Sequence, residues 1–218
     1  MTLNKITNHF YCTELDTPFG KGPWRTYGYL LCREEGNLII GTSSHFEENE
    51  KQITELGGVS RQYLTHRDEA HQNADWITNT YSAPLVCHEK EKEAISKRCI
   101  VGDTINQRTM IHPDFEAIPT PGHTSGSTCY LWQAPDASYL FTGDTIFFNK
   151  NRWAIFVMNG SQEEMLSSLD TISKLDFDYL VPGAHTGDAN MEATTKEKTQ
   201  ETIDEIVARI KSGKNANF

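Results

Sequence analysis

The sequence predicts an α/β fold in which two sheets lie inside and helices lie outside, a four-layer αββα sandwich. A chain of 218 residues is long enough for one domain with a substantial core. Strand-like runs and helical segments occur in both halves of the chain, which indicates two similar layers packed together. The sequence contains no internal repeat, low-complexity tract or linker-like run, so we expect a single domain over residues 1–218.

The first half of the chain is expected to alternate strands with helices. The turn Glu35-Gly36-Asn37 indicates a hairpin between two of the strands, and Gly57-Gly58 stops the first helix. The expected strands cover residues 9–15, 26–32, 37–40, 61–65 and 84–88, and the expected helices cover 47–56 and 73–81.

The second half begins with short β-rich runs and ends with helices. Ser161 and Glu164 form a capping-box pattern, which opens a helix with Met165, Leu169 and Ile172 on one face. The expected strands cover residues 115–119, 127–133, 138–142 and 179–182, and a last helix covers 194–211.

The composition excludes several function classes. A formal net charge of -10 argues against nucleic acid and anionic membrane surfaces as partners. No run of residues approaches the length of a membrane span, and residues 1–10 lack the apolar stretch of a signal peptide, so we expect a cytoplasmic protein. The five cysteines are scattered without a C-x-x-C pair, which favours buried, reduced thiols.

Histidine and aspartate side chains stand at the ends of several expected strands. His66, Asp68 and His71 follow one strand within six residues, and His123 lies on a Pro-Gly turn. Asp144 and His185 each follow an apolar strand. Ligands delivered from strand ends meet at one edge of a sheet, where a rigid scaffold holds them.

These residue types predict a metal centre. Imidazole and carboxylate ligands together suit zinc, iron or manganese. We therefore expect one or two divalent transition metals, with zinc as the first choice. Successive side chains of a strand point to opposite faces, so the Glu69 side chain should point away from those of the expected ligands, and Glu69 is not among them.

The motifs resemble those of the metallo-β-lactamase superfamily, in the compact form of the glyoxalase II catalytic domain. The segment from His66 to His71 is similar to the family's H-x-H-x-D-H motif, and residues 120–127 are similar to its P-G-H-T-x-G-S turn. Gly143-Asp144 and the segment ending at His185 follow in the family's order. The resemblance spans about residues 26 to 187 and implies the metallo-β-lactamase fold.

The resemblance also implies a ligand set. His66, Asp68 and His123 fall on the first metal site, His71 and His185 fall on the second, and Asp144 bridges the two. Asp68 stands where most members have His, and Ala184 shifts the last His by one residue. Ala70 stands where the family has Asp. The second site should therefore bind metal more weakly, and Ala70→Asp should strengthen it, provided that the backbone follows the family's geometry there.

The function implied is metal-dependent hydrolysis. A metal-bound hydroxide would attack a small ester, thioester or lactone, with Asp144 and His123 as the catalytic residues. Two alternatives remain. One is an iron-dependent, oxygen- or sulfur-handling oxidoreductase of the same fold, and the other is a degenerate, non-catalytic metal-binding module.

Several other polar and aromatic residues are expected to have ordinary structural roles. Trp153 and Phe156 suit either the wall of a substrate pocket or the core. The remaining histidines are expected to be surface or core residues without ligands, namely His9, His45, His88 and His112.

Overall fold

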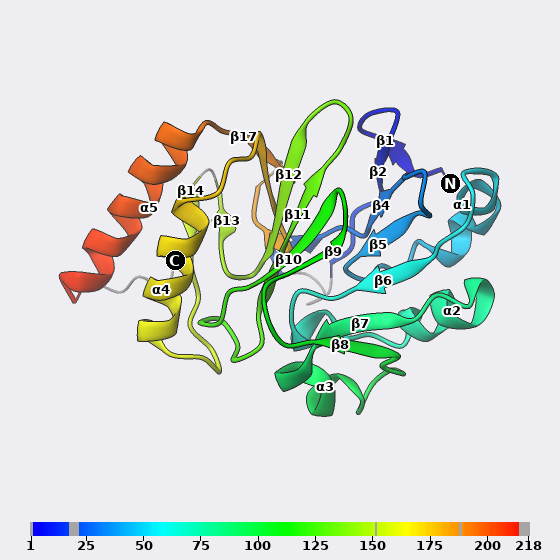
Figure 1. The fold of residues 1–218 in the computed structure, drawn as a ribbon, viewed down its shortest axis with the longest axis horizontal. Helices are drawn as coiled ribbons and strands as arrows, with labels where there is room; N and C mark the ends of the chain where they lie inside the picture. Colours follow the sequence, from blue (N-terminus) through cyan, green and yellow to red (C-terminus); the bar gives the residue numbers. More distant parts are fainter. Residues whose placement is uncertain (1, 18–21, 151, 188, 214–218) are drawn as a thin grey trace. The chain divides into compact units, whose positions relative to one another are not determined.

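The computed structural model describes residues 2–17, 22–150, 152–187 and 189–213. The chain divides into two compact units, an N-terminal unit over residues 1–105 and a C-terminal unit over residues 106–218. Each unit has its own sheet and its own helices (Figure 1). The expectation of a single domain over residues 1–218 stays a prediction.

The N-terminal unit contains a seven-stranded sheet. Its first four strands pair antiparallel and the other three add in parallel. The expected hairpin is present, and Gly36 adopts a φ of 102° in its turn. In sheet order the strands are β1 (Asn4–Lys5), β2 (Phe10–Cys12), β4 (Tyr29–Leu31), β5 (Leu38–Ile40), β6 (Arg61–Tyr63), β7 (Leu85–His88) and β8 (Asp103–Ile105). A separate short strand, β3 (Arg25–Thr26), bridges to Asp16.

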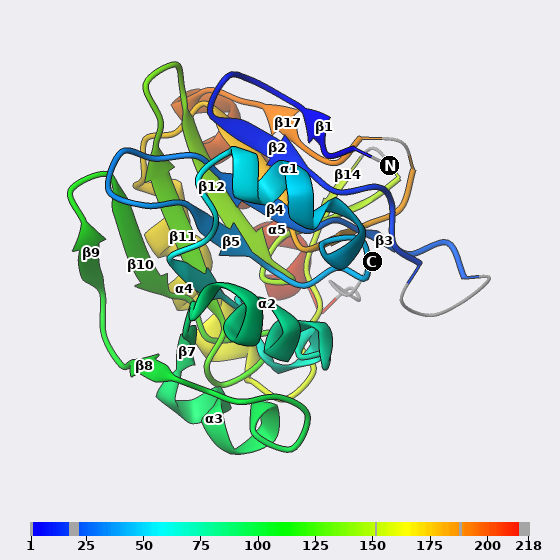
Figure 2. The ribbon, with the colours of Figure 1, turned by 90° about the vertical axis from the view of Figure 1, so that its right-hand side faces the viewer.

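Helices cover one face of this sheet (Figure 2). Ile53 and Ile77 of two helices pack with Leu30 and Ile39 of the sheet in one buried apolar cluster. Burial of such side chains is worth about 1.5–3 kcal/mol each, so it holds the helices on the strands. The helical segments are η1 (Glu47–Asn49), α1 (Glu50–Glu55), η2 (Arg67–Glu69), α2 (Asn73–Tyr81) and α3 (Glu89–Ile95).

The C-terminal unit contains a six-stranded sheet in which only β12 and β15 are parallel neighbours. A hairpin of two further strands pairs with a short strand that carries His185. In order the sheet strands are β17 (Glu192–Ala193), β15 (Tyr179–Pro182), β12 (Ser138–Gly143), β11 (Thr128–Gln133), β10 (Phe115–Pro119) and β9 (Thr109–His112). The hairpin and its partner are β13 (Phe147–Asn149), β14 (Arg152–Ala154) and β16 (Ala184–His185).

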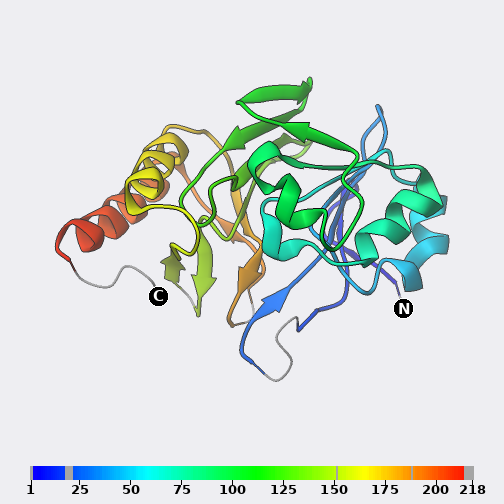
Figure 3. The ribbon, with the colours of Figure 1, turned by 90° about the horizontal axis from the view of Figure 1, so that it is seen from below.

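Two helices, α4 (Gln162–Ser173) and α5 (Lys196–Lys211), lie side by side on one face of this sheet (Figures 1 and 3). The capping box that opens α4 is present, because Ser161 and Glu164 exchange both hydrogen bonds. Apolar side chains of both helices form one cluster with strand residues such as Leu140 and Leu180. The helices therefore hold the sheet whose strand ends carry His123 and Asp144.

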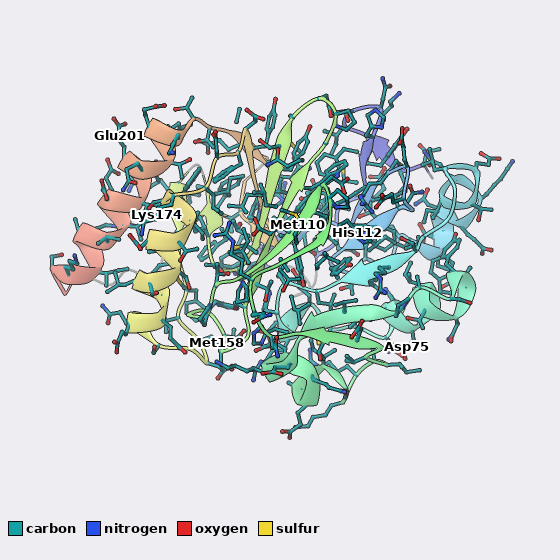
Figure 4. The ribbon with its side chains drawn as sticks, in the orientation of Figure 1. Asp75, Met110, His112, Met158, Lys174 and Glu201 are labelled. Carbon is teal, nitrogen blue, oxygen red and sulfur yellow. The ribbon has the colours of Figure 1, made fainter. Side chains whose placement is uncertain are left out.

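The strands that the sequence analysis missed are two to four residues long. Such runs are too short to show an alternating pattern, and β9 is an edge strand whose Met110 is 60% exposed (Figure 4). In the described part of the chain, every helix is too short or too polar to span a bilayer.

Candidate metal centre

Three of the six predicted ligands follow β6 in the N-terminal unit. His66 is buried, and Asp68 lies in η2 with its Oδ2 3.9 Å from His66 Nε2. That separation is too long for a hydrogen bond. It suits two ligands of one ion, because atoms about 2.1 Å from a shared metal lie at most about 4.2 Å apart.

The second ring nitrogen of His66 is held by its neighbour in the chain. Thr65 Oγ1 lies 2.9 Å from His66 Nδ1, and both residues are buried. Metal-binding histidines are oriented in this way, since the nitrogen that does not bind metal donates to a protein acceptor. His66 therefore presents Nε2 to the side of Asp68.

Arg67 fixes the backbone between the two predicted ligands. Its guanidinium makes a bidentate pair with Glu91 of α3 at 2.6 and 2.7 Å, and its backbone N–H donates to the same carboxylate at 3.0 Å. The hydrogen bond to buried Glu91 raises the pKa of Arg67, so this pair stays charged. The segment that carries His66 and Asp68 is thus tied to a helix of the same unit.

Position 70 is part of the core. Ala70 is buried in an apolar cluster with Leu85, Cys87 and Ile95. The expectation that Ala70→Asp strengthens the second site stays a prediction, and the apolar surroundings that a carboxylate would enter there argue against it. His71 is exposed, and its Nδ1 accepts the backbone N–H of Asn73 at 3.4 Å, at the start of α2.

His123 lies on a turn that the C-terminal unit holds by its backbone. Its carbonyl oxygen accepts N–H groups from Met158, Asn159 and Gly160 at 3.0, 2.9 and 3.2 Å, in the loop before α4 (Figure 4). Gly122 has a φ of 146°, and a Cβ there would lie 2.6 Å from the Cα of Met165. Only glycine fits this close approach of the turn to the helix.

Thr124 and Ser127 form hydrogen bonds within the same turn. The Ser127 hydroxyl accepts the Thr124 N–H at 3.0 Å, and the two hydroxyls lie 2.9 Å apart. The turn therefore has internal hydrogen bonds in addition to those that join it to the α4 loop.

The ring of His123 is oriented from the other side. Its Nδ1 lies 2.8 Å from the carbonyl oxygen of Phe156, and since a carbonyl only accepts, Nδ1 carries the hydrogen. Nε2 then faces Asp144, whose Oδ2 lies 3.7 Å away. Asp144 follows Gly143, which has a φ of 52° at the end of β12.

His185 stands on β16 next to Phe148 of β13 and is buried. The Gly183 N–H donates to the Gly143 carbonyl at 2.8 Å, which joins the segment before His185 to the segment before Asp144. Ala184, the residue that the family pattern lacks, is itself buried at the start of β16. The extra residue is thus accommodated inside a short strand.

The donor sets of the two units fit a divalent metal. In each unit a histidine presents Nε2 to an aspartate at a separation that suits a shared ion, while Nδ1 is held by the protein. Nitrogen and carboxylate donors are those that zinc, iron and manganese accept. The assignment of all six residues as ligands stays a prediction.

The other candidates have structural roles. Trp153 is buried in the α4–α5 cluster and donates to Glu192, so it belongs to the core, whereas Phe156 contributes the carbonyl that orients His123. His88 caps α3 by accepting the Lys90 N–H. All five cysteines are free thiols, and burial raises the pKa of Cys129 to about 12, which keeps it protonated.

The sequence did not predict the roles of three residues that support the site, namely Thr65, Glu91 and Phe156. Thr65 stands directly before His66, and this adjacency was the one signal in the sequence. Glu91 is far from the motif along the chain, and Phe156 acts through its backbone, which carries no sequence signal.

Two curated proteins are similar to this chain in sequence. The chain is 40% identical over 83 residues to the hydroxyacylglutathione hydrolase of Buchnera aphidicola subsp. Baizongia pistaciae, a match covering 38% of this chain and 30% of that relative. It is 27% identical over 157 residues to the probable polyketide biosynthesis zinc-dependent hydrolase PksB of Bacillus subtilis, covering 68% of this chain and 67% of the relative. The chain thus spans less than a third of the first relative's length.

The fold is similar to that of solved metallo-beta-lactamases. The mono-zinc form of FIM-1 from Pseudomonas aeruginosa superposes with a TM-score of 0.70 at 12% identity, covering 93% of this chain and 94% of that one. This likeness confirms the predicted α/β fold class. Residues 73–185, slightly more than half of the sequence, match the model of the metallo-beta-lactamase superfamily. The chain therefore belongs to the metallo-beta-lactamase superfamily.

Proposed function

We propose that this protein is a metal-dependent hydrolase that acts on a small ester, thioester or lactone. His66, Asp68 and His123 would hold the first metal, His71 and His185 would hold a second, and Asp144 would bridge them. The matched histidine–aspartate pairs of the two units carry the proposal, because both present Nε2 beside a carboxylate. The family and the names of the two relatives support hydrolysis, and one of those names supports zinc.

A bound divalent metal would supply Lewis acidity, lowering the pKa of a coordinated water and polarising the scissile carbonyl. The chain's own residues would supply position. Phe156 and Thr65 hold the rings of His123 and His66 in fixed orientations, so the two rings would need little rearrangement to bind a metal. Asp144, whose Oδ2 lies 3.7 Å from His123 Nε2, would accept a proton or hydrogen bond from the attacking water.

Metal analysis combined with a hydrolysis panel tests this proposal. Protein purified without chelators should contain at least one equivalent of zinc, iron or manganese, and should hydrolyse members of a panel of short acyl esters, thioesters and lactones. Chelation should abolish turnover, and metal should restore it.

The alternatives predict other outcomes of the same experiment. Iron content with oxygen consumption and no hydrolysis would favour the oxidoreductase. Protein that takes up none of the three metals and hydrolyses nothing would contradict the proposal in favour of a non-catalytic module.

A further inference from the structure

Glu69 lies beside the proposed ligand His66, yet it belongs to no expected ligand set. Its Oε2 accepts the Thr65 backbone N–H at 2.7 Å, and its Oε1 accepts the Thr65 hydroxyl at 2.7 Å. The Glu69 carbonyl oxygen accepts the Thr42 hydroxyl at 2.6 Å, which fixes the backbone of Glu69 as well. The carboxylate is mostly buried, with its side chain 13% exposed, so water competes little for these bonds.

These contacts determine the direction of the Thr65 hydroxyl. A carboxylate only accepts hydrogen bonds, so the hydroxyl hydrogen points to Glu69 Oε1. The Thr65 oxygen then offers only its lone pairs to His66 Nδ1, 2.9 Å away. His66 Nδ1 must therefore carry the ring hydrogen, which leaves the lone pair on Nε2.

We infer that Glu69 is a positioning residue for the metal centre, acting through Thr65 to keep His66 in the tautomer whose Nε2 can bind a metal. The inference rests on the proposed function for its consequence, metal affinity. The hydrogen-bond relay itself is a property of the metal-free protein. Both can therefore be tested separately.

Glu69→Gln keeps the shape of the side chain but removes its charge and replaces one acceptor oxygen with a donor. The two Glu69 oxygens each accept a different donor, so glutamine can serve only one of them. The Thr65 N–H cannot turn away, whereas the hydroxyl rotates. The glutamine oxygen should therefore keep the backbone N–H, and its NH₂ should donate to the Thr65 oxygen. The hydroxyl hydrogen then turns to His66 Nδ1, which moves the ring hydrogen to Nε2 and blocks the ligand.

Long-range proton–nitrogen correlation spectra of the metal-free protein at about pH 8, where imidazole is neutral, report which nitrogen of His66 carries hydrogen. Native protein and Thr65→Ser should show hydrogen on Nδ1, and Glu69→Gln should show it on Nε2. Zinc affinity, measured by competition with a chromophoric chelator, should fall about 10- to 100-fold in Glu69→Gln and in Thr65→Val. The affinity of Thr65→Ser should stay within a few-fold of native.

Asp178→Asn is the matched control. Asp178 accepts the N–H and the hydroxyl of Ser138 at 2.8 and 2.7 Å, the same pair of donors, but with no histidine attached. This variant should keep native zinc affinity and the native His66 tautomer. If Glu69→Gln does not fold, Thr65→Val and Thr65→Ser still decide the question.

Native protein with hydrogen on His66 Nε2, or a Glu69→Gln protein that keeps Nδ1–H and full zinc affinity, would overturn the inference. A tautomer switch in a protein that binds none of zinc, iron and manganese would instead overturn the proposed function, whereas the hydrogen-bond relay would still be supported.

Discussion

The two units orient a histidine in the same way but with different parts of the chain. In the C-terminal unit a backbone carbonyl, that of Phe156, accepts the Nδ1 hydrogen of His123. In the N-terminal unit a side chain, that of Thr65, does the same for His66, and it depends in turn on Glu69. The orientation of His123 thus depends on the path of the backbone, and that of His66 depends on the side chains at positions 65 and 69. The two histidines should therefore respond to different substitutions.

The largest effect is expected from His123→Ala. Loss of one ligand should cost about 3 kcal/mol of metal binding, roughly a hundredfold, if zinc sites of about 10–16 kcal/mol share their energy among four ligands. Hydrolysis should be abolished. The fold should remain, because the His123 carbonyl keeps the three N–H groups that it accepts. Metal content, turnover and circular dichroism check this, and native turnover would show that the site is elsewhere.

Ala70→Asp tests the core of the N-terminal unit. A carboxylate placed among Leu85, Cys87 and Ile95 should destabilise the protein by about 3 kcal/mol, and it should not tighten a second metal. Urea denaturation and a metal titration measure both effects. An unchanged midpoint together with a tighter second metal would restore the family's arrangement at this position.

Gly122→Ala tests the backbone arrangement around His123. The new Cβ would meet the Cα of Met165 at a φ that L-residues rarely adopt, so the turn must shift. We expect about 2 kcal/mol of destabilisation and weaker metal binding. Phe156→Leu is the control, because it keeps the carbonyl that His123 uses and should change zinc affinity less than about threefold. Equal losses in the two variants would mean that the Phe156 ring, rather than its backbone, orients His123.

The contrast between local sequence patterns and tertiary contacts also explains which parts of the fold could be predicted from the sequence. Turn residues, capping boxes and apolar strand runs act locally. The helix at residues 73–81, the start of the helix at 162–173 and the strands 115–119 and 179–182 were therefore predicted to within a residue or two. The expected strand over residues 26–32 was in part wrong, because the structure divides it into β3 and β4.

The groups that orient the ligands are a different matter. Their role depends on tertiary contacts, such as Arg67 with Glu91 across 24 residues or His123 with Phe156 across 33. A sequence motif identifies residues that can bind a metal, but it does not specify the backbone geometry that orients their side chains. Ala70 shows the same limit, since its direction into the core follows from the geometry of η2.

The smallest effect is expected from Asp178→Asn, and it depends on pH. A single oxygen of Asp178 accepts both Ser138 donors, so asparagine can keep both bonds and loses only the charge. The Ser138 N–H and hydroxyl lower the pKa of Asp178 in the folded protein. Its carboxylate therefore stabilises the fold above the pKa of the unfolded chain, about 3.9, and this contribution disappears as the pH falls through the lower folded pKa.

Asp178 is exposed and solvent screens its charge, so the difference in unfolding free energy between the native protein and Asp178→Asn should be only about 0.5 kcal/mol at neutral pH. The difference should vanish in acid, as measured by urea denaturation at a series of pH values. Glu69→Gln should behave otherwise, because the two Glu69 oxygens accept separate donors and the amide must lose one of these hydrogen bonds. A pH-independent difference for Asp178→Asn would show that the amide fails to replace the hydrogen bonds, and the contrast between the two carboxylates would then not hold.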